Sequence, residues 1–314
     1  MNGPDLGKVF LYSDWMPELP EVETIVRGLD KRVAGDAVES VWIGSRKQPL
    51  KSPAGAIAAT LEGKRIVCVH RAGKHIVFDL EGEARTAVRV AAKAKNKRGA
   101  GRGQTRQAAS LQSGVQTAQW IVHLGMTGRM VVCEAADEIV KHTHLVAKLA
   151  SGRELRFVDP RMFGKLSVHG GGFDPGGVEP LEVSEERFVE LFRGRKTPIK
   201  SALLNQQLLR GVGNIYADES LFRAGLRPRR EASTIKRAQL GRLHGAVQEV
   251  LREAIALGGS SISDYVDADG EEGFFQLQHR VYGREGEACL VCGTEIRRIV
   301  LAGRSSHYCE KCQK

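Results

Sequence analysis

Residues 16–24 of the chain read Met16-Pro17-Glu18-Leu19-Pro20-Glu21-Val22-Glu23-Thr24. They open a stretch whose apolar residues recur at helical spacing, through Ile25, Val26, Leu29 and Val33. A proline suits the first helical positions, and acidic side chains suit a helix N-terminus, where backbone N–H groups are unpaired. The segment therefore predicts a helix with ordinary N-terminal capping.

The same residues allow a chemical interpretation. Without Met16, Pro17 would carry a free secondary amine next to the Glu18 carboxylate. An N-terminal amine can attack a carbonyl carbon and form a Schiff base. With Met16 attached, the Pro17 nitrogen is a tertiary amide and is not nucleophilic. These nine residues alone leave both interpretations, capping and catalysis, open.

The composition limits the class of protein. A chain of 314 residues is long enough for two domains with cores of their own. Its net charge of +10 and pI of about 9.4 favour nucleic acid or another anionic surface as partner, although basic tails on a neutral enzyme would give the same balance. No apolar run could span a membrane, and residues 1–15 do not resemble a signal peptide. We therefore expect a cytoplasmic protein without a membrane partner, whose cysteines are thiols or metal ligands.

The order of elements predicts an α+β protein. After the first helix, short apolar strands and turns indicate an antiparallel, sandwich-like domain over residues 16–170. A linker rich in Gly and Pro follows at 171–184, then a helical domain at 185–273 and short strands with cysteines at 274–314. The helices expected in the helical domain are Glu185–Arg193, Ile199–Gln206, Ile215–Ala224 and Thr234–Leu257.

One long segment interrupts the strands. Residues from about 85 to 119 are rich in Ala, Gly, Gln, Arg and Lys and show no apolar periodicity. We expect this basic insertion to be disordered. Its charge could add non-specific affinity for DNA, but a solvated loop would have the same composition.

The cysteines near the C-terminus give the most specific spacing. Two Cys-x2-Cys knuckles, sixteen residues apart, are formed by Cys289 with Cys292 and by Cys309 with Cys312. This is the four-cysteine zinc-ribbon pattern. Four thiolates close a tetrahedral site, so we expect one structural Zn²⁺, with two disulfides as the alternative. Cys68 and Cys133 lie in apolar strands and are expected in the core.

A glycine-rich motif lies between two of the expected helices, at Leu209-Arg210-Gly211-Val212-Gly213-Asn214-Ile215-Tyr216-Ala217-Asp218-Glu219. Its glycines allow a tight turn that presents backbone N–H groups at a helix N-terminus, where anions such as DNA phosphate bind. Asn214 could contact that phosphate or cap the helix. Lys200, one helix upstream, and Arg304, at an expected hairpin tip between the knuckles, could add phosphate contacts.

Two other glycine-flanked turns carry bulky side chains. The segment 123–128 contains Met126, and the segment 159–164 contains Arg161 and Phe163. Such Met and Phe residues usually belong to a core. On exposed loops, apolar side chains can instead separate stacked bases, and an arginine can fill the space left by a flipped nucleotide.

Together these motifs resemble the formamidopyrimidine-DNA glycosylase family over residues 16–314. The resemblance covers Pro-Glu-Leu-Pro-Glu-Val-Glu, His-Leu-Gly-Met-Thr-Gly, Asp-Pro-Arg-Met-Phe-Gly, the glycine-rich motif and the cysteine knuckles. It implies an N-terminal β-sandwich, a helix–two-turn–helix domain and a β-hairpin zinc finger, with damaged double-stranded DNA in the cleft between them. We expect a monomer.

The implied activity is that of a bifunctional glycosylase and lyase, which excises oxidised purines (8-oxoguanine and formamidopyrimidines) and cleaves the strand by β,δ-elimination. By this resemblance Pro17 is the nucleophile at the sugar C1′, Glu18 transfers protons, and Lys74 assists at the damaged nucleotide. A loop over 259–275 would cap the flipped base. The implied DNA contacts are Met126, Arg161 and Phe163 within the duplex, and His142, Lys200, Asn214 and Arg304 at phosphates.

The chain departs from the family pattern at its start, in the basic insertion and at Met162, where a basic residue is frequent. The first departure concerns the chemistry, because only a chain that begins at Pro17 has the amine. We expect residues 1–15 to reflect a start assigned too early or a segment that is trimmed. Two alternatives stay open: an endonuclease VIII-type enzyme for oxidised pyrimidines, and a catalytically dead DNA-binding protein if residues 1–15 are retained.

Overall fold

The computed structural model describes residues 16–82, 116–260 and 273–314. The expectations for residues 1–15, for most of the basic insertion and for most of the 259–275 loop therefore lie outside the described residues. At its C-terminal end the insertion is shorter than predicted, because residues 116–119 already belong to a strand that pairs along its whole length with its neighbour.

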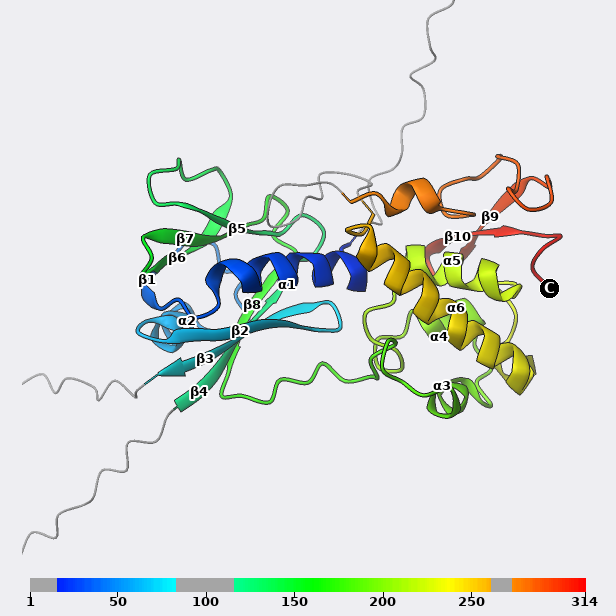
Figure 1. Cartoon of the computed structure of the whole chain (residues 1–314), viewed down its shortest axis with the longest axis horizontal. Helices are drawn as coiled ribbons and strands as arrows, with labels where there is room; N and C mark the ends of the chain where they lie inside the picture. Colours follow the sequence, from blue (N-terminus) through cyan, green and yellow to red (C-terminus); the bar gives the residue numbers. More distant parts are fainter. Residues whose placement is uncertain (1–15, 83–115, 261–272) are drawn as a thin grey trace, which may run out of the picture.

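Two four-stranded antiparallel sheets form the N-terminal unit (Figure 1). The strand orders are β1-β6-β7-β5 and β2-β3-β4-β8, and the core between the sheets includes a stacked Phe78 and Trp120. The strands are β1 (Val38–Ile43), β2 (Arg65–Ala72), β3 (His75–Gly82), β4 (Gln116–His123), β5 (Arg129–Glu134), β6 (Thr143–Leu149), β7 (Arg153–Val158) and β8 (Lys165–His169).

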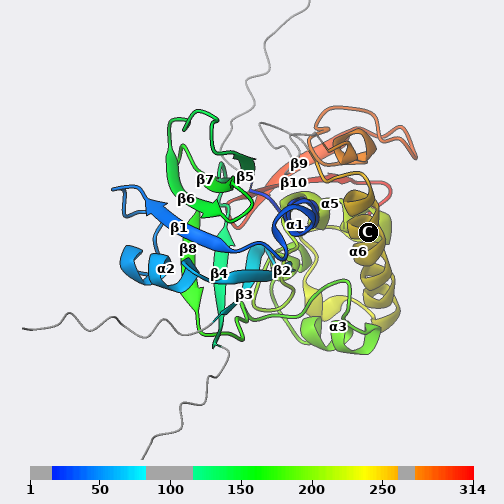
Figure 2. The same ribbon diagram turned by 60° about the vertical axis from the view of Figure 1, so that its left-hand side comes forward.

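Helix α1 (Leu19–Val33) connects this unit to the helical one. Figure 2 shows it between the sheets and the helices α5 and α6. Most of its apolar face packs into the sandwich core, but Leu19 at its start belongs to the core of the helical unit. The Leu19 N–H donates to the Gly211 carbonyl oxygen at 3.0 Å. The first turn of α1 is therefore fixed by residues almost two hundred positions later in the chain.

The helical unit packs around Tyr216, Phe188 and Phe192. Its α-helices are α3 (Glu185–Phe192), α4 (Ile199–Leu203), α5 (Asn214–Ala224) and α6 (Arg237–Ala256), and two short 3₁₀ helices are η1 (Ala232–Thr234) and η2 (Phe275–Gln278). Strands β9 (Ile296–Leu301) and β10 (Arg304–Cys309) form a C-terminal hairpin beside α5. Gly225 ends α5 in the left-handed conformation (φ 70°), which a glycine adopts without strain.

The α+β class, the antiparallel sandwich and the C-terminal hairpin are confirmed, and Arg304 lies directly after the tight turn of that hairpin. Helix α2 (Ala54–Leu61) was not predicted, because only Ile57 and Leu61 of this short Ala-rich segment are buried. Helix α4 ends at Leu203, earlier than expected. Cys68 and Cys133 are half-buried, so their assignment to the core was wrong; the Cys68 thiol donates to Asp79. No helix in the described part of the chain is long and apolar enough to cross a membrane.

Candidate active site and DNA interface

Glu18 lies buried where the start of α1 meets the start of α5. Its Oε1 accepts a hydrogen bond from the Ile215 N–H at 3.2 Å, and its Oε2 has no donor among the described residues. Gly213 makes this approach possible, because a Cβ there would lie 2.1 Å from the Glu18 carboxyl carbon. Burial raises the pKa of Glu18 to about 7, against the opposing effect of the Lys74 ammonium. A carboxyl with this pKa can both donate and accept a proton near neutral pH.

Lys74 lies in the turn between β2 and β3 and is also buried. Burial lowers the pKa of its ammonium, while Glu18 raises it and Arg304 lowers it. Glu18 and Arg304 also act electrostatically on Lys200. Four of the predicted site residues, from the N-terminus, a sandwich turn, α4 and the hairpin, thus converge on one region.

A buried carboxylate, Glu179, fixes the turn that carries Lys74. It accepts hydrogen bonds from the Gly73 N–H and from Arg71 on the sandwich, and from Arg210 of the glycine-rich motif, all between 2.9 and 3.0 Å. The motif patterns did not point to Glu179, since it lies in the linker. It joins the two units beside the candidate active site.

Glu21 is a second functional candidate that the motif patterns missed. Its Oε2 accepts the Glu18 N–H at 2.9 Å, and its Oε1 accepts the Ser260 N–H at 2.8 Å and the hydroxyl of Tyr216. Burial raises the pKa of Glu21. Its spacing of three residues from Glu18, a capping-box spacing, was the available signal.

The two glycine-flanked turns lie against each other. The Thr127 hydroxyl donates to Asp159 at 2.6 Å and accepts the Arg161 N–H at 3.2 Å. Phe163 is 50% exposed, and the Arg161 guanidinium lies over its ring at 4.9 Å. Arg161 and Phe163 of the second turn are therefore exposed, as the wedge interpretation requires.

Met126 is half-buried on the first of these turns. His142 is exposed, and its carbonyl oxygen accepts the Asp159 N–H at 3.0 Å, so it lies next to the second turn. The predicted DNA contacts of the sandwich thus come from neighbouring loops.

Lys200 and Asn214 are less accessible than their predicted phosphate contacts suggest. The Lys200 ammonium lies 2.7 Å from Asp218 and donates to the Ser305 carbonyl oxygen. The Asn214 side-chain amide donates to the Ser305 hydroxyl at 3.2 Å. Both phosphate contacts stay predictions.

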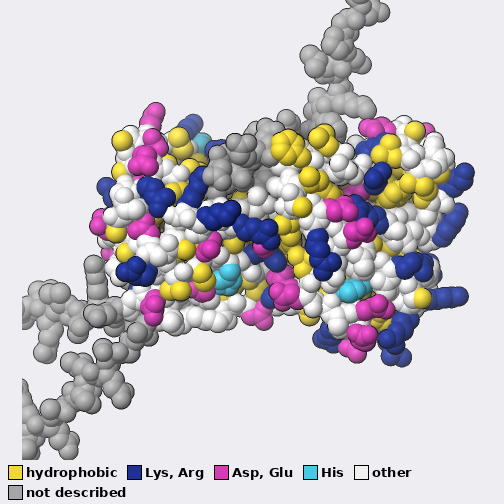
Figure 3. Space-filling model, viewed as in Figure 1, with side chains coloured by type: hydrophobic (Ala, Val, Ile, Leu, Met, Phe, Trp, Pro, Cys, Tyr) yellow, Lys and Arg dark blue, Asp and Glu magenta, His cyan; other side chains and the backbone are white. Residues whose placement is uncertain are grey.

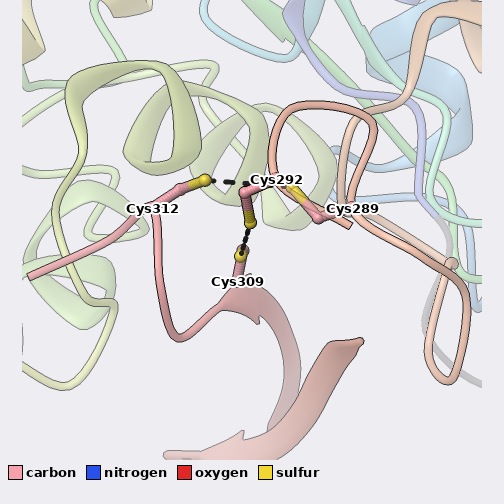
Figure 4. A group of neighbouring side chains, drawn as sticks. All are labelled: Cys289, Cys292, Cys309 and Cys312. Carbon is pink, nitrogen blue, oxygen red and sulfur yellow. Dashed lines mark hydrogen bonds between the residues drawn. The ribbon is translucent and has the colours of Figure 1, made fainter. Parts of the chain in front are cut away.

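The four C-terminal cysteines point toward one another (Figure 4). Their sulfur atoms all lie within 4.8 Å of each other, and the pairs Cys289–Cys312 and Cys292–Cys309 are 3.9 and 3.5 Å apart. These distances are too long for disulfides, whose sulfurs are about 2.05 Å apart. They fit tetrahedral Zn²⁺, because Zn–S bonds of about 2.3 Å place the sulfurs roughly 3.8 Å apart.

Comparison with known families covers most of the chain. Residues 16–166 match the formamidopyrimidine-DNA glycosylase N-terminal domain, and residues 177–266 match the H2TH domain of the same enzyme. Residues 286–314 match a zinc finger found in FPG and IleRS. Formamidopyrimidine-DNA glycosylases of Solibacter usitatus and Gluconobacter oxydans are 41% and 38% identical to the chain, over 95% of it and 100% of each relative.

The chain belongs to the formamidopyrimidine-DNA glycosylase family.

Solved structures of the family agree with this assignment. A complex of a mutant Lactococcus lactis Fpg with Fapy-dG DNA has a TM-score of 0.77 and 30% identity, over 95% of this chain and 100% of that one. The complex of the Lactococcus lactis enzyme with abasic-site DNA has a TM-score of 0.77 and 31% identity, over 95% and 99%. A third, with DNA containing an oxidised pyrimidine, has a TM-score of 0.76 and 30% identity, over 95% and 100%.

Family membership identifies the class of reaction and the metal site. The chain is a DNA glycosylase for oxidised bases, and its four cysteines form the structural zinc site of the family's zinc finger. Lys and Arg side chains lie over both units on the face in Figure 3, with acidic side chains between them, so this face is not uniformly basic.

Proposed function

We propose that the protein excises oxidised purines from duplex DNA and then cleaves the strand, with the Pro17 amine as nucleophile. The buried Glu18 carboxyl, with a pKa of about 7 directly beside Pro17, carries this proposal. The Lactococcus lactis complexes with Fapy-dG DNA and abasic-site DNA support the substrate class. In this proposal the protein acts as a cytoplasmic monomer, divided into units at 16–170, 185–273 and 274–314.

The chemistry follows from an uncharged secondary amine. The Pro17 nitrogen bonds to C1′, the bond from C1′ to the damaged base breaks, and the base leaves with a proton. Ring opening gives an iminium ion, because the proline nitrogen already carries two ring carbons; Glu18 is placed to take and return protons in these steps. The positive charge of the iminium ion acidifies C2′. Loss of the C2′ proton breaks the C3′–O bond, and a second elimination breaks the C5′–O bond. Lys74 and Arg304 would hold the departing phosphates.

Recognition would precede this chemistry. In the proposal Met126, Arg161 and Phe163 enter the duplex, where Arg161 pairs with the base left unpaired by flipping. His142 and Asn214 would contact phosphates.

Borohydride trapping tests the nucleophile, because borohydride reduces the iminium ion to a stable tertiary amine that links protein and DNA. A form that begins at Pro17 should be trapped on abasic DNA, and a verified 314-residue form should bind but not be trapped. The matched control is Pro17→Gly in the short form, which keeps an N-terminal amine. Efficient trapping of the 314-residue form would identify another nucleophile, with Lys74 the first candidate.

The alternative substrate class has one supporting observation, since the Lactococcus lactis enzyme was also solved with DNA containing an oxidised pyrimidine. Parallel trapping on duplexes that carry 8-oxoguanine or an oxidised pyrimidine separates the two classes. We expect faster trapping with 8-oxoguanine. Preference for the pyrimidine would favour an endonuclease VIII-type activity, and no trapping on any substrate would favour a DNA-binding protein without activity.

A further inference from the structure

Lys200 is held in a buried ion pair. The residue is 1% exposed, and its Nζ lies 2.7 Å from Oδ1 of Asp218, which is equally buried. The same Nζ donates to the Ser305 carbonyl oxygen at 2.6 Å. For Lys200 to reach a phosphate, Asp218 would have to stay behind as a buried carboxylate that has lost its lysine partner, with the His307 imidazole 3.4 Å away. Separating a buried ion pair in this way is strongly unfavourable. A direct role in phosphate binding is therefore hard to reconcile with this geometry.

The polar groups around this ion pair all bind strand β10. Asp218 also accepts the Ser306 hydroxyl at 3.0 Å and the His307 N–H at 2.8 Å. Asn214 donates to the Ser305 hydroxyl at 3.2 Å. Side chains of α4 and α5 thus bind three consecutive residues of β10, and the residue directly before these three is Arg304.

Arg304 itself is exposed. It follows a turn in which Ala302 and Gly303 have positive φ angles of 48° and 77°. Its position is fixed from one side by this turn and from the other by the contacts of residues 305–307. The next residue, Ser305, is bonded to Lys200 and to Asn214, and Asn214 directly precedes Ile215, whose N–H binds Glu18. Arg304 therefore lies close to the candidate active site.

We propose that Lys200 is a positioning residue: with Asp218 it anchors residues 305–307 of β10, so that Arg304 faces the DNA phosphate, and it makes no phosphate contact of its own. This inference rests on the proposed phosphate contact of Arg304. It gives a role to a lysine–aspartate pair inside the helical unit, where a buried ion pair contributes little net stability.

A double-mutant cycle tests the inference, because effects that pass through one group do not add. The zinc-loaded form beginning at Pro17 would be compared as parent, Lys200→Met, Arg304→Ala and the double variant. The probe is a duplex containing a tetrahydrofuran abasic analogue, and affinity is measured at several salt concentrations. Loss of one phosphate contact reduces the slope of log K against log salt by about 0.9.

We expect each single variant to lose about one such contact, and the double variant to bind within about twofold of Arg304→Ala, with the same slope. If the losses instead multiply and the slope falls by about 1.8, Lys200 binds a phosphate itself and the inference is wrong. If Arg304→Ala binds like the parent, the proposed phosphate contact of Arg304 is wrong. If Lys200→Met nevertheless loses affinity in that case, Lys200 does not act through Arg304 and the inference is wrong too.

If Lys200→Met folds poorly, the variant Ser306→Ala tests the inference instead. It removes one hydroxyl that donates to Asp218 and leaves the Lys200–Asp218 pair in place. It should weaken binding in the parent and have no further effect in Arg304→Ala. The matched control is Ser233→Ala, an exposed serine remote in sequence, which should bind like the parent. Equal, independent losses in both backgrounds for Ser306→Ala would overturn the inference.

Discussion

At the scale of single residues, the protonation of Glu18 links its proposed catalytic role to the stability of the fold. Its pKa of about 7 in the folded protein lies above the ordinary value of 4.5. The folded protein therefore keeps a proton that the unfolded chain releases, and the free energy of unfolding falls as pH rises from about 4.5 to 7. The free energy of unfolding can fall by at most about 3 kcal/mol, because a shift of one pKa unit corresponds to about 1.4 kcal/mol.

We predict that Glu18→Gln abolishes excision but stabilises the protein relative to the parent at pH 8, by up to about 3 kcal/mol. The advantage should be nearly gone at about pH 4, where most Glu18 carboxyls are protonated in both states. Urea denaturation at the two pH values measures it. Glu39→Gln, at an exposed carboxyl, is the control and should show no such dependence. A Glu18→Gln advantage that is the same at both pH values would contradict the assignment.

Residues differ in how far the sequence alone could identify them. Motifs and spacing were sufficient for the cysteines and for the family, and both predictions are confirmed. The partners Glu179 and Asp218 could not be identified, because their roles come from contacts with residues 106 and 88 positions away. The catalytic and DNA-binding roles of the motif residues stay predictions.

At the scale of elements, the two glycine-flanked turns, 123–128 and 159–164, pack against each other because Gly125 has no side chain. A Cβ there would lie 2.5 Å from the Phe163 carbonyl carbon, and Gly125 also has a φ of 68°. We predict that Gly125→Ala lowers the free energy of unfolding by about 2–4 kcal/mol, as the sum of backbone strain and overpacking. Excision of 8-oxoguanine should fall at least tenfold.

Gly152→Ala is the matched control for backbone strain. Gly152 has a φ of 88°, in the β6–β7 turn, and a Cβ added there would meet no atom within 4 Å. It should lose about 1 kcal/mol and keep its activity. Thermal denaturation and single-turnover excision of both variants make the comparison. Equal losses would mean that packing of the two turns is unimportant.

The zinc-binding hairpin is an element with a very small core. Among the described residues this core comprises Phe222, Val281 and Ile296, with the cysteines packed against them. We predict that Cys309→Ser or removal of zinc by a chelator disorders the hairpin and lowers DNA affinity at least tenfold, while the sandwich stays folded. Metal analysis should find one zinc per parent chain and little in the variant. As a control, Cys133→Ser lies outside the cysteine cluster and should keep its zinc. A parent protein that binds DNA normally without zinc would contradict the prediction.

At the scale of the whole molecule, Glu179 joins the two large units next to the active site. It is 8% exposed and is bonded to Arg71 and Arg210. We predict that Glu179→Gln lowers kcat about tenfold with a smaller change in KM, because the turn that carries Lys74 loses its anchor. Asp174→Asn is the control: its carboxylate also pairs with Arg210, but it is 71% exposed, so the change should be small. Equal effects of both variants would argue against a positioning role.

The arrangement of units was predictable in outline only. Apolar periodicity and turn residues indicated the sandwich and helices, since both depend on local patterns. The path of α1 through two cores was not predictable, because Leu19 and Val22 belong to the same apolar stripe and yet pack into different units. Helix α2 was missed for another reason: its eight residues are almost all small or apolar, so they show no alternation of polar and apolar positions.

The contact between the first turn of α1 and the start of α5 has a consequence for biosynthesis. Glu18 and Ile215 are 197 positions apart, and Pro17 is buried in the finished fold. A ribosome adds about 5–20 residues per second, so the segment that covers Pro17 emerges roughly 10–40 seconds after it. If Pro17 is the nucleophile, as proposed, an enzyme that exposes its amine has ready access during this interval. Exposure of the amine and closing of the fold would then compete kinetically, and a chain that folded with Pro17 still blocked would be a stable but inactive product.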